Sequence, residues 1–507
     1  MWRRRTTAWL SAVPRTTVSP AVPAPGPFHA ATDEIVLLPW SRDGTDPAPR
    51  VLHLVIAWLL DEPERVGQCA RLDRPCRLGR GGDDPDALEL IQLVRQRPGI
   101  NTLCAPLATT AISRRQLLFT PVDARHVRVQ CVGRRELRHD GVLAAECVTE
   151  PGDTLVLENT AVFVVELRPA VMPALRHWPE PDFASGDPDA HGVVGESAPA
   201  WRLRDELAAA ARSEAHVLVH GPSGVGKELA AAAIHELSQR RDGPLVARNA
   251  ATLPSGLLDA ELFGSARNYP NPGSPERAGL VGAADGGTLL LDEIGELPEE
   301  HQAHLLRVLD TGGEHHRLGE AAARRSAFRL IGATNRDPAS LKHDFLARFG
   351  THVGVPGLDA RVADVPLLVR ALLARIAART PGTAERFFDG GDAARARLDP
   401  LLLERLLRHR YTLHTRELER LLRVAVATSP ADYLAVTPEL VVALRSPRTR
   451  DSAPPPSSLA RDDAERQAVA AALNATGWNV TRAAEQLGMS RHALHRAIRK
   501  HGLVEEE

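Results

Sequence analysis

The chain is poor in cysteine and has no long apolar run, and these two absences exclude several classes of protein. Its five cysteines include no Cys-x-x-Cys pair and no nearby pair of histidines. We therefore expect free thiols in a reducing compartment rather than a disulfide framework or a zinc site. No uninterrupted apolar stretch of about eighteen residues occurs, which argues against a membrane span. Together these features predict a cytoplasmic protein with no membrane partner.

The chain also lacks a dominant charge. Lys and Arg total 62 and Asp and Glu total 64, which gives a net charge of −2 over 507 residues. Any contact with nucleic acid therefore requires a local basic patch. The length exceeds that of one ordinary core and predicts about two to four domains. The Arg-rich start, Met1–Pro14, has an apolar patch too short for a signal peptide, and we interpret it as a disordered or wrongly assigned start.

Shifts in composition divide the chain into segments. Residues 1–50 are rich in Pro, Thr and Arg and are typical of a disordered tail. Residues 51–170 contain short strand-like runs between Gly, Pro and Asp turns, which predicts an all-β sandwich. An alternating strand and helix pattern then indicates an α/β region, which a purely helical region follows. The remaining predicted segments are a linker at 171–194, an α/β core at 195–360, a helical region at 361–445, a linker at 446–458 and an all-α helical unit at 459–507.

A glycine-rich loop indicates a nucleotide site. The buried-strand run Val217–His220 leads into Gly-Pro-Ser-Gly-Val-Gly-Lys-Glu at 221–228 and then into a helical stretch. Strand, glycine loop, lysine and helix in this order are the context of a P-loop. The glycines let backbone N–H groups approach phosphates, and the helix N-terminus favours anions. The expected nucleotide-binding residues are Gly221, Ser223, Gly224, Gly226, Lys227 and Glu228.

Two carboxylates follow a second hydrophobic strand. The run Leu289–Leu291 ends at Asp292 and Glu293. Asp292 suits a magnesium ligand and Glu293 suits the group that polarises an attacking water, so ATP and Mg²⁺ are the expected cofactors. A third buried run ends at Asn335. This asparagine either contacts the γ-phosphate or the attacking water, or it is an ordinary turn residue.

Residues 195–428 resemble the AAA+ ATPase domain of bacterial enhancer-binding proteins, the sigma-54-type activators. The P-loop matches their variant, in which Glu228 stands where most P-loops have Ser or Thr. The resemblance implies an α/β P-loop core with a helical lid. The other matching motifs are Glu261–Gly264, Ala284–Thr288, Asp292–Pro298, Ala333–Arg336 and Thr415–Leu418.

The resemblance also implies roles for residues that the local pattern leaves undefined. Asn249 falls at the asparagine that restrains the catalytic glutamate, here Glu293, and Asn335 falls in sensor I. Arg348 aligns with an arginine that reaches the γ-phosphate of the neighbouring subunit, and Arg416 aligns with sensor II. An arginine supplied by a neighbour implies ATP hydrolysis in a ring, and the resembling proteins form hexamers.

One loop departs from the family. Sigma-54 activators carry Gly-Ala-Phe-Thr-Gly-Ala where this chain, at the same spacing, reads Asn-Tyr-Pro-Asn-Pro-Gly at Asn268–Gly273. Pro270 and Asn271 replace the Phe and Thr that contact sigma-54, and proline stiffens a loop. One reading is that Tyr269 takes over from the phenylalanine. The alternative is a DNA-bound regulator that does not engage sigma-54 and acts as a repressor or through another sigma factor, with the ring as an assembly switch.

The C-terminal segment resembles the Fis-type helix-turn-helix that ends enhancer-binding proteins. A short helical run, Thr481–Leu487, and a Gly turn precede the basic helical run Arg491–Lys500. This geometry predicts binding to double-stranded DNA, with base contacts near the start of the second helix and phosphate contacts beyond it. A metabolic P-loop enzyme such as a kinase would not explain this module. The predicted DNA-binding residues are Arg491, His492, His495, Arg496, Arg499 and Lys500.

The N-terminal region resembles a forkhead-associated domain, a β-sandwich that binds phosphothreonine. The resemblance rests on Arg77–Arg80, Ile112–Leu117 and Glu150–Leu155. It implies a phosphothreonine-bearing partner and gives Arg80, Ser113 and Arg114 as the binding residues. Gln116 replaces the family's histidine, so the fold serves either phosphopeptide binding or docking alone. No receiver domain is recognised, which argues against control by a response-regulator mechanism.

Overall fold

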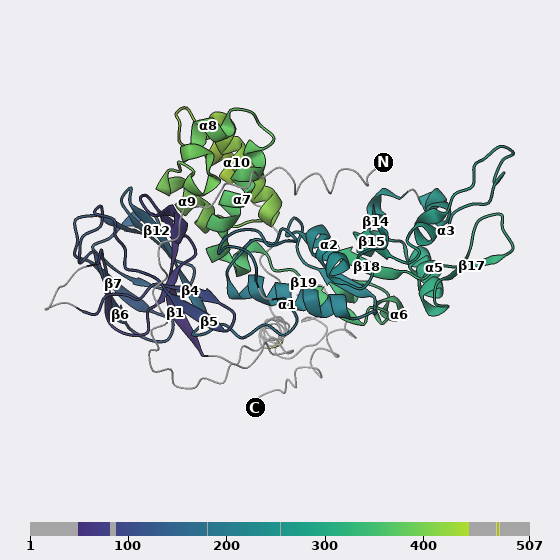
Figure 1. Cartoon of the computed structure of the whole chain (residues 1–507), viewed down its shortest axis with the longest axis horizontal. Helices are drawn as coiled ribbons and strands as arrows, with labels where there is room; N and C mark the ends of the chain where they lie inside the picture. The colour runs from purple at the N-terminus through teal and green to yellow at the C-terminus, as the bar shows by residue number, and fades with distance from the viewer. Residues whose placement is uncertain are drawn as a thin grey trace. The chain divides into compact units, whose positions relative to one another are not determined.

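The computed structural model describes residues 49–81, 88–179, 181–253 and 255–445, together with Leu473 and Thr476 (Figure 1). The chain divides into two units, which meet between Thr437 and Pro438, and α11 (Pro438–Leu444) is the described helix of the second. The predicted tail up to residue 48, the linker 446–458 and the predicted DNA-binding residues all lie outside the described residues.

Residues 50–169 form two antiparallel sheets that share one apolar core. The strands β1 (Arg50–Leu59) and β12 (Ala161–Pro169) pair in the middle of an eight-stranded sheet of order β5-β4-β2-β1-β12-β11-β8-β9. The second sheet has the order β10-β7-β6-β3. Its strands and those that complete the first sheet are β2 (Cys69–Arg71), β3 (Cys76–Leu78), β4 (Val94–Arg97), β5 (Ile100–Leu103), β6 (Leu117–Pro121), β7 (Val127–Cys131), β8 (Leu137–His139), β9 (Val142–Leu143), β10 (Glu146–Thr149) and β11 (Thr154–Leu157).

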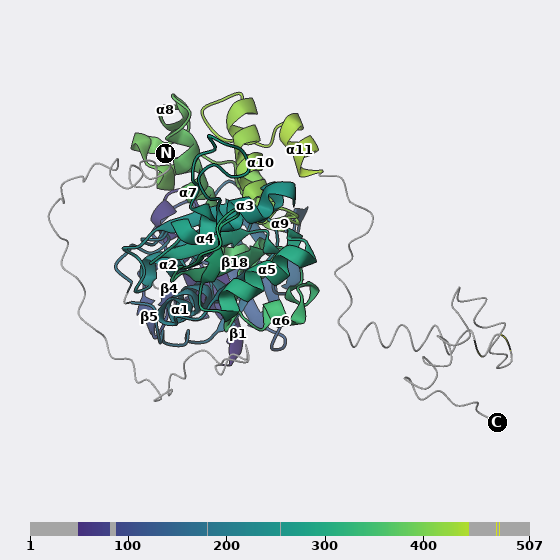
Figure 2. The same cartoon turned by 90° about the vertical axis from the view of Figure 1, so that its right-hand side faces the viewer.

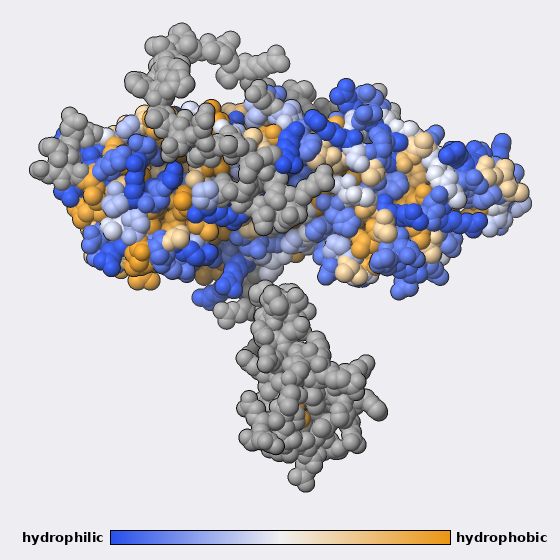
Figure 3. All heavy atoms as spheres, turned by 90° about the horizontal axis from the view of Figure 1, so that it is seen from below, coloured by the Kyte–Doolittle hydropathy of each residue, from blue (hydrophilic) through white to orange (hydrophobic). Residues whose placement is uncertain are grey.

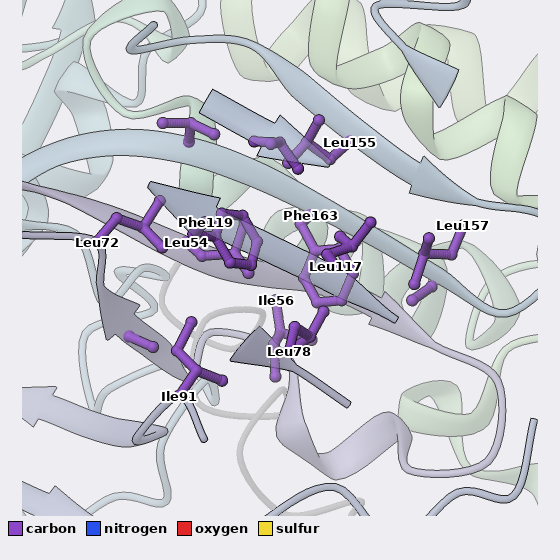
Figure 4. Packing of buried hydrophobic residues seen from close by; sticks show 14 of the residues in the cluster. Leu54, Ile56, Leu72, Leu78, Ile91, Leu117, Phe119, Leu155, Leu157 and Phe163 are labelled. Carbon is purple, nitrogen blue, oxygen red and sulfur yellow. The ribbon is translucent and has the colours of Figure 1, made fainter. Parts of the chain in front are cut away.

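The central strand β1 is buried on both faces. Leu54 packs with Phe119 and Phe163 in the core to which both sheets contribute (Figure 4). Val55 points to the opposite face and packs in a small cluster with Ala363, a residue far along the chain. A strand covered on both sides needs apolar residues at successive positions, because neighbouring side chains point to opposite faces. This explains why β1 is a nearly continuous apolar run.

The next region is built on a five-stranded parallel sheet of order β14-β15-β18-β13-β19. In β13, Val217 and Val219 pack against α1 and α2, and Leu218 packs with α3 to α6 on the other face. Figure 2 shows β18 lying between α2 and α5. Burial on both faces is the usual state of a parallel sheet. The strands are β13 (Val217–His220), β14 (Leu245–Asn249), β15 (Thr288–Asp292), β18 (Arg329–Thr334) and β19 (Thr351–Gly354), and the helices are α1 (Ala198–Arg212), α2 (Lys227–Leu237), α3 (Leu258–Phe263), α4 (Gly279–Ala283), α5 (Glu299–Asp310) and α6 (His343–Leu346).

A purely helical region follows the sheet. The Asp399 carboxylate accepts a hydrogen bond from the backbone N–H of Leu401 (2.9 Å), and Pro400 begins the helix, as is usual at a capped helix start. The apolar faces of the last two helices of this region are buried. The helices are α7 (Val365–Ala377), α8 (Thr383–Phe387), α9 (Pro400–Arg408) and α10 (His414–Thr428), and the 3-10 helix η8 (Val362–Asp364) precedes them.

Residues 171–194, predicted as a linker, contain neither helix nor strand among the described positions but are packed against α1. One carboxylate oxygen of Asp205 accepts hydrogen bonds from the backbone N–H groups of Arg176 (2.9 Å), His177 (2.7 Å) and Trp178 (3.1 Å). The indole of Trp178 is buried in the core beside α1 and α2. These contacts hold the first part of the connection against α1.

Within the described ranges, no helix is both long enough and apolar enough to cross a membrane. The five cysteines all lie in these ranges and are free thiols, of which Cys69 and Cys76 are buried. On the face seen in Figure 3, hydrophilic and hydrophobic residues are interspersed over the coloured surface.

Candidate nucleotide site and neighbouring loops

The loop after β13 has the backbone shape of a phosphate-binding loop. Gly221, Gly224 and Gly226 have positive φ angles of 152°, 80° and 103°. A Cβ atom on Gly221 would lie 2.5 Å from the carbonyl oxygen of Val355, and one on Gly224 would lie 2.1 Å from that of Leu413. Both positions therefore require glycine, for conformation and for space.

Lys227 begins α2 and folds back over this loop. Its Nζ donates hydrogen bonds to the carbonyl oxygens of Gly221 (3.0 Å) and Pro222 (3.2 Å). Burial lowers the pKa of Lys227, and the neighbouring Glu293 and Asp292 oppose that shift. The ammonium group is thus positioned inside the loop, where it could attract a bound phosphate by its charge and donate N–H hydrogen bonds to it.

Three carboxylates meet beside the lysine. Asp292 ends β15, and its Oδ1 accepts a hydrogen bond from the backbone N–H of Glu293 (2.9 Å). Glu293 has a left-handed backbone with φ of 53°, a strained conformation that is typical of functional sites. Burial and the Asp292 carboxylate, which is within hydrogen-bonding reach, raise the pKa of Glu228. Two carboxyl groups this close are suited to share a divalent cation.

The helical lid closes the other side of the site. A cavity of about 440 Å³ lies between the P-loop and the start of α10. The hydroxyl oxygen of Thr415 is buried beside it and has no hydrogen-bond partner among the described residues. Other residues that line the cavity are Val193, Val194, Ser223, Lys227, Glu228, Asp292, Glu293, Arg361, Leu372 and Arg416.

Three other predicted catalytic residues, Asn249, Asn335 and Arg348, do not line this cavity. Asn249 ends β14 opposite Asp292 in the strand register, and its Oδ1 accepts a hydrogen bond from the backbone N–H of Ala251 (2.9 Å). Asn335 follows β18 and is exposed outside the cavity lining. Arg348 is also outside the lining, and its Nε lies 2.7 Å from Oδ1 of Asp310.

Sequence reasoning missed several residues of the cavity wall. Thr415 directly precedes Arg416 in the Thr-Arg-Glu-Leu motif, so that motif could have identified it as a residue of the site. Arg361, Val193 and Val194 belong to no motif that the chain displays. Only the fold brings them together, because Arg361 donates a hydrogen bond to the carbonyl oxygen of Val194 (3.4 Å) across 167 positions.

The loop Asn268–Gly273, which departs from the family motif, is closed by a hydrogen bond to the side chain of Asn268. Asn268 has a positive φ of 66°, and its Oδ1 accepts a hydrogen bond from the backbone N–H of Gly273 (2.9 Å). Its own N–H donates to the carbonyl oxygen of Ser274 (2.9 Å). The ring of Tyr269 lies against Gly319, where a Cβ would come within 2.5 Å of a ring carbon. Gly319 belongs to the loop between β16 (Glu314–His316) and β17 (Ala323–Arg325), so the two loops pack together.

The three predicted phosphopeptide residues come together at one edge of the sandwich. The backbone N–H of Arg80 donates to the carbonyl oxygen of Ser113 (3.2 Å), and Arg114 follows directly. The Ser113 hydroxyl accepts a hydrogen bond from the backbone N–H of Arg134 (3.1 Å). The buried Gln116 amide donates to the carbonyl oxygen of Arg135 (2.7 Å), so it fixes the same group of loops. The cluster carries several arginines on adjacent loops.

Comparison with known proteins identifies two family regions. Residues 193–348 match the family model described as Sigma-54 interaction domain, and residues 460–501 match the model described as Bacterial regulatory protein, Fis family. The transcriptional regulatory protein ZraR of Escherichia coli (strain K12) is 36% identical over 315 residues, which cover 60% of this chain and 67% of ZraR. The DNA-binding transcriptional regulator NtrC of Bradyrhizobium sp. (strain RP501 Parasponia) is 33% identical over 62% of this chain and 70% of its own length.

This chain belongs to the sigma-54 activator family of transcriptional regulators. A further relative of this chain is the Nif-specific regulatory protein of Azotobacter vinelandii, 35% identical over 59% of this chain and 56% of its own length. Among solved structures, NtrX from Brucella abortus in complex with ATP is 30% identical, with a TM-score of 0.42, and the match covers 61% of this chain and 69% of that one. The prediction of a P-loop region followed by a Fis-family DNA-binding region is confirmed.

We predict that the Lys227→Ala variant of this protein loses most of its affinity for nucleotide. The ammonium group is the only Lys or Arg side chain inside the described P-loop, and hydrogen bonds to charged groups contribute on the order of 10- to 100-fold in binding. Titration with a fluorescent ADP measures the change, and urea unfolding of the ligand-free variant serves as its control. Ordinary affinity in this variant would refute the P-loop assignment.

We also predict that the affinity for magnesium and nucleotide together rises with pH. The raised pKa of Glu228 means that this carboxyl keeps its proton above its ordinary range, and a carboxyl must lose its proton to bind a cation. Glu228→Gln removes the titrating group, so the affinity of this variant for magnesium should be lower and should vary less with pH. Magnesium titrations between about pH 5 and pH 8 test this, with Glu64→Gln on the exposed surface as the matched control. An unchanged pH profile in Glu228→Gln would contradict the prediction.

Proposed function

We propose that this protein hydrolyses ATP in the cavity between P-loop and lid and uses the reaction to remodel a transcription complex. The observation that carries the proposal is that Lys227, Asp292, Glu293 and Arg416 line one cavity. Lys227 neutralises the β- and γ-phosphates, and Glu293 orients and polarises the attacking water. Arg416 approaches the phosphates from the lid and stabilises the charge that develops there.

Magnesium fits the same cavity. When bound, Mg²⁺ neutralises phosphate oxygens and orients them for attack. Asp292 and Glu228 are the residues that would bind it, because their carboxyl groups are close enough to raise the pKa of Glu228. The buried hydroxyl of Thr415, which has no partner among the described residues, supports a ligand at the same place.

The remaining catalytic assignments require a ring of subunits, for which a hexamer is our proposal. Arg348 lies outside the cavity of its own subunit, which suits a guanidinium that acts on a neighbour's γ-phosphate. Asn249 pairs in the strand register with Asp292, the residue before Glu293. We assign Asn249 to restrain Glu293 until ATP is bound. Asn335 is assigned to sense the γ-phosphate from the tip of β18.

DNA binding is assigned to the Fis-family region, whose predicted contact residues lie outside the described residues. Arg491 and His492 would meet base edges in the major groove, because the sequence pattern predicts that they stand at the start of the second helix of the motif. The residues assigned to phosphate contacts or to the same helix face are His495, Arg496, Arg499 and Lys500. In this arrangement the ATPase is concentrated at one DNA site.

The loop at Asn268–Gly273 leaves two candidate partners. In the first, Tyr269 contacts RNA polymerase carrying sigma-54, in place of the phenylalanine of the family motif. Its side chain is 40% exposed although one side of the ring packs on Gly319, so part of it is available to a partner. In the second, the chain is a DNA-bound regulator that serves another sigma factor or acts as a repressor, with ATP as an assembly switch. The hydrogen bond between the Asn268 side chain and the backbone of Gly273 favours the second candidate, because it holds the end of this loop in one conformation.

Open-complex formation by purified sigma-54 polymerase, on a promoter that carries the protein's own binding site, separates these candidates. If sigma-54 is the target, wild-type protein should open the promoter in an ATP-dependent reaction, and opening should fall on the order of 100-fold in Glu293→Ala, since this variant loses the base that activates water. Tyr269→Ala should lose opening but retain ATP turnover. If wild-type protein binds DNA and turns over ATP without opening the promoter, sigma-54 is not its target.

We further propose that the sandwich is a forkhead-associated domain that binds a phosphothreonine-bearing protein. Arg80, Ser113 and Arg114 lie on adjacent loops, where guanidinium and hydroxyl groups can surround a phosphate. Docking alone, without a phosphate, is the alternative, because the glutamine at 116 replaces a histidine of the family.

Phosphopeptide binding should depend on these loops. In anisotropy titrations with a degenerate phosphothreonine peptide library, Arg80→Ala and Ser113→Ala should each weaken binding on the order of tenfold, because each removes a hydrogen bond to a charged group. Arg125→Ala, in an exposed turn of the same sandwich, should bind as wild type does. Equal binding of the unphosphorylated library would leave docking as the function of this domain.

A further inference from the structure

One short segment connects the nucleotide cavity with the sandwich. Val193 and Val194 line the cavity, and Ser197 caps the start of α1 three residues later. Asp364, in η8, accepts hydrogen bonds from the backbone N–H groups of Glu196 (2.8 Å) and Ser197 (2.9 Å) and from the Ser197 hydroxyl (2.6 Å). The cavity wall is therefore fixed on one side to the region that precedes the lid.

The Glu196 side chain fixes the same segment on its other side. Its Oε1 accepts hydrogen bonds from Nη2 of Arg97 (2.9 Å) and from the backbone N–H of Gly186 (2.9 Å). Its Oε2 accepts one from the indole N–H of Trp201 (3.0 Å). The carboxylate side chain is 5% exposed, so these partners replace its water. Nη2 of Arg168 donates to the carbonyl oxygen of Glu196 (2.7 Å).

Both of these arginines belong to the sandwich. Arg97 ends β4, and Arg168 lies in β12 at the middle of the larger sheet. The guanidinium of Arg97 also lies over the ring of Phe183, 4.9 Å from its centroid, and donates to the carbonyl oxygen of the same residue (3.1 Å). Three kinds of contact thus fix the orientation of this guanidinium toward Glu196, which a flexible ammonium would not reproduce.

Arg204 carries the connection back to the cavity wall. Its Nη2 donates to the carbonyl oxygen of Val193 (2.8 Å) and its Nη1 to that of Gly195 (2.8 Å). Its guanidinium lies over the ring of Trp201, 4.4 Å from the centroid. Trp201 is also bonded to Glu196, so a shift of that carboxylate would disturb the support of Val193.

We propose that Arg97 is a positioning residue of the nucleotide site, which acts through Glu196 on the wall formed by Val193 and Val194. The sandwich is then a structural part of the ATPase site, and its docking sets the affinity for nucleotide. This inference rests on the proposed function of the cavity as an ATP site. By linkage, nucleotide binding favours the docked sandwich by the same factor, so a partner that changes the docking also changes nucleotide affinity.

Nucleotide titrations of the full-length chain test this inference. Arg97→Ala should weaken binding of fluorescent ADP by roughly 5- to 150-fold, the usual size of a coupling between sites. In ATP turnover the KM should rise while kcat changes little, because Asp292 and Glu293 are untouched. Arg95→Ala, exposed on the same strand, should match wild type. Arg97→Lys should fall between wild type and Arg97→Ala.

A double-mutant cycle with Glu196→Gln separates positioning from a general loss of stability. If Arg97 acts through Glu196, Arg97→Ala should have much less effect on ADP affinity in the Glu196→Gln background than in wild type. Urea unfolding without nucleotide identifies any variant that is not folded. If Arg97→Ala is not folded, the ADP affinity of Arg97→Lys is compared with that of wild type instead. Wild-type ADP affinity in folded Arg97→Ala, or fully additive effects in the cycle, would overturn the inference. Failure of wild-type protein to bind ADP would instead overturn the proposed ATP site.

Discussion

A buried charge that loses its partner destabilises a protein strongly, and the junction between sandwich and ATPase is built on such charges. The Arg204 side chain is fully buried and lies 2.8 Å from the buried carboxylate of Asp189. Removal of one member of such a pair costs about 3–5 kcal/mol, because the other charge is left in a medium that solvates it poorly. Glu196 and Asp364 are satisfied in the same way, each by three or more donors. The junction therefore has few intermediate arrangements, and the packed residues 171–194 belong to it.

In contrast to the junction, the nucleotide cavity contains charged groups whose charges are not fully compensated. Burial lowers the pKa of Lys227 and raises that of Glu228, so both charged forms are disfavoured without a ligand. Phosphate groups would add anions beside the partly desolvated ammonium group of Lys227, and a cation would relieve the crowding of Glu228 with Asp292. Perturbed titration of several groups in one cavity, together with a strained backbone at Glu293, is typical of a functional site. The rigid junction thus surrounds a site whose own groups are left incompletely paired.

The features that could be predicted from sequence are those whose signal is local. The P-loop and the pair Asp292–Glu293 each occupy a few consecutive residues, and the parallel strands that position them are continuous apolar runs. The strand-like runs of the N-terminal region likewise lie within β1, β7, β11 and β12. The bond between Arg97 and Glu196 spans 99 positions and has no local signature. The same holds for the Asn268 side chain that closes its loop, because an asparagine that caps a turn looks like any other turn residue.

The altered loop and the nucleotide cavity use separate residues. None of the residues Asn268–Gly273 lines the cavity, and Tyr269 is supported by Gly319 rather than by the P-loop. Substitution in this loop therefore leaves the residues that line the cavity in place. The sandwich contacts, by contrast, lead directly to the cavity wall through Glu196. Buried polar contacts thus connect the N-terminal sandwich with the wall of the nucleotide cavity, whereas the loop Asn268–Gly273 lies outside that cavity.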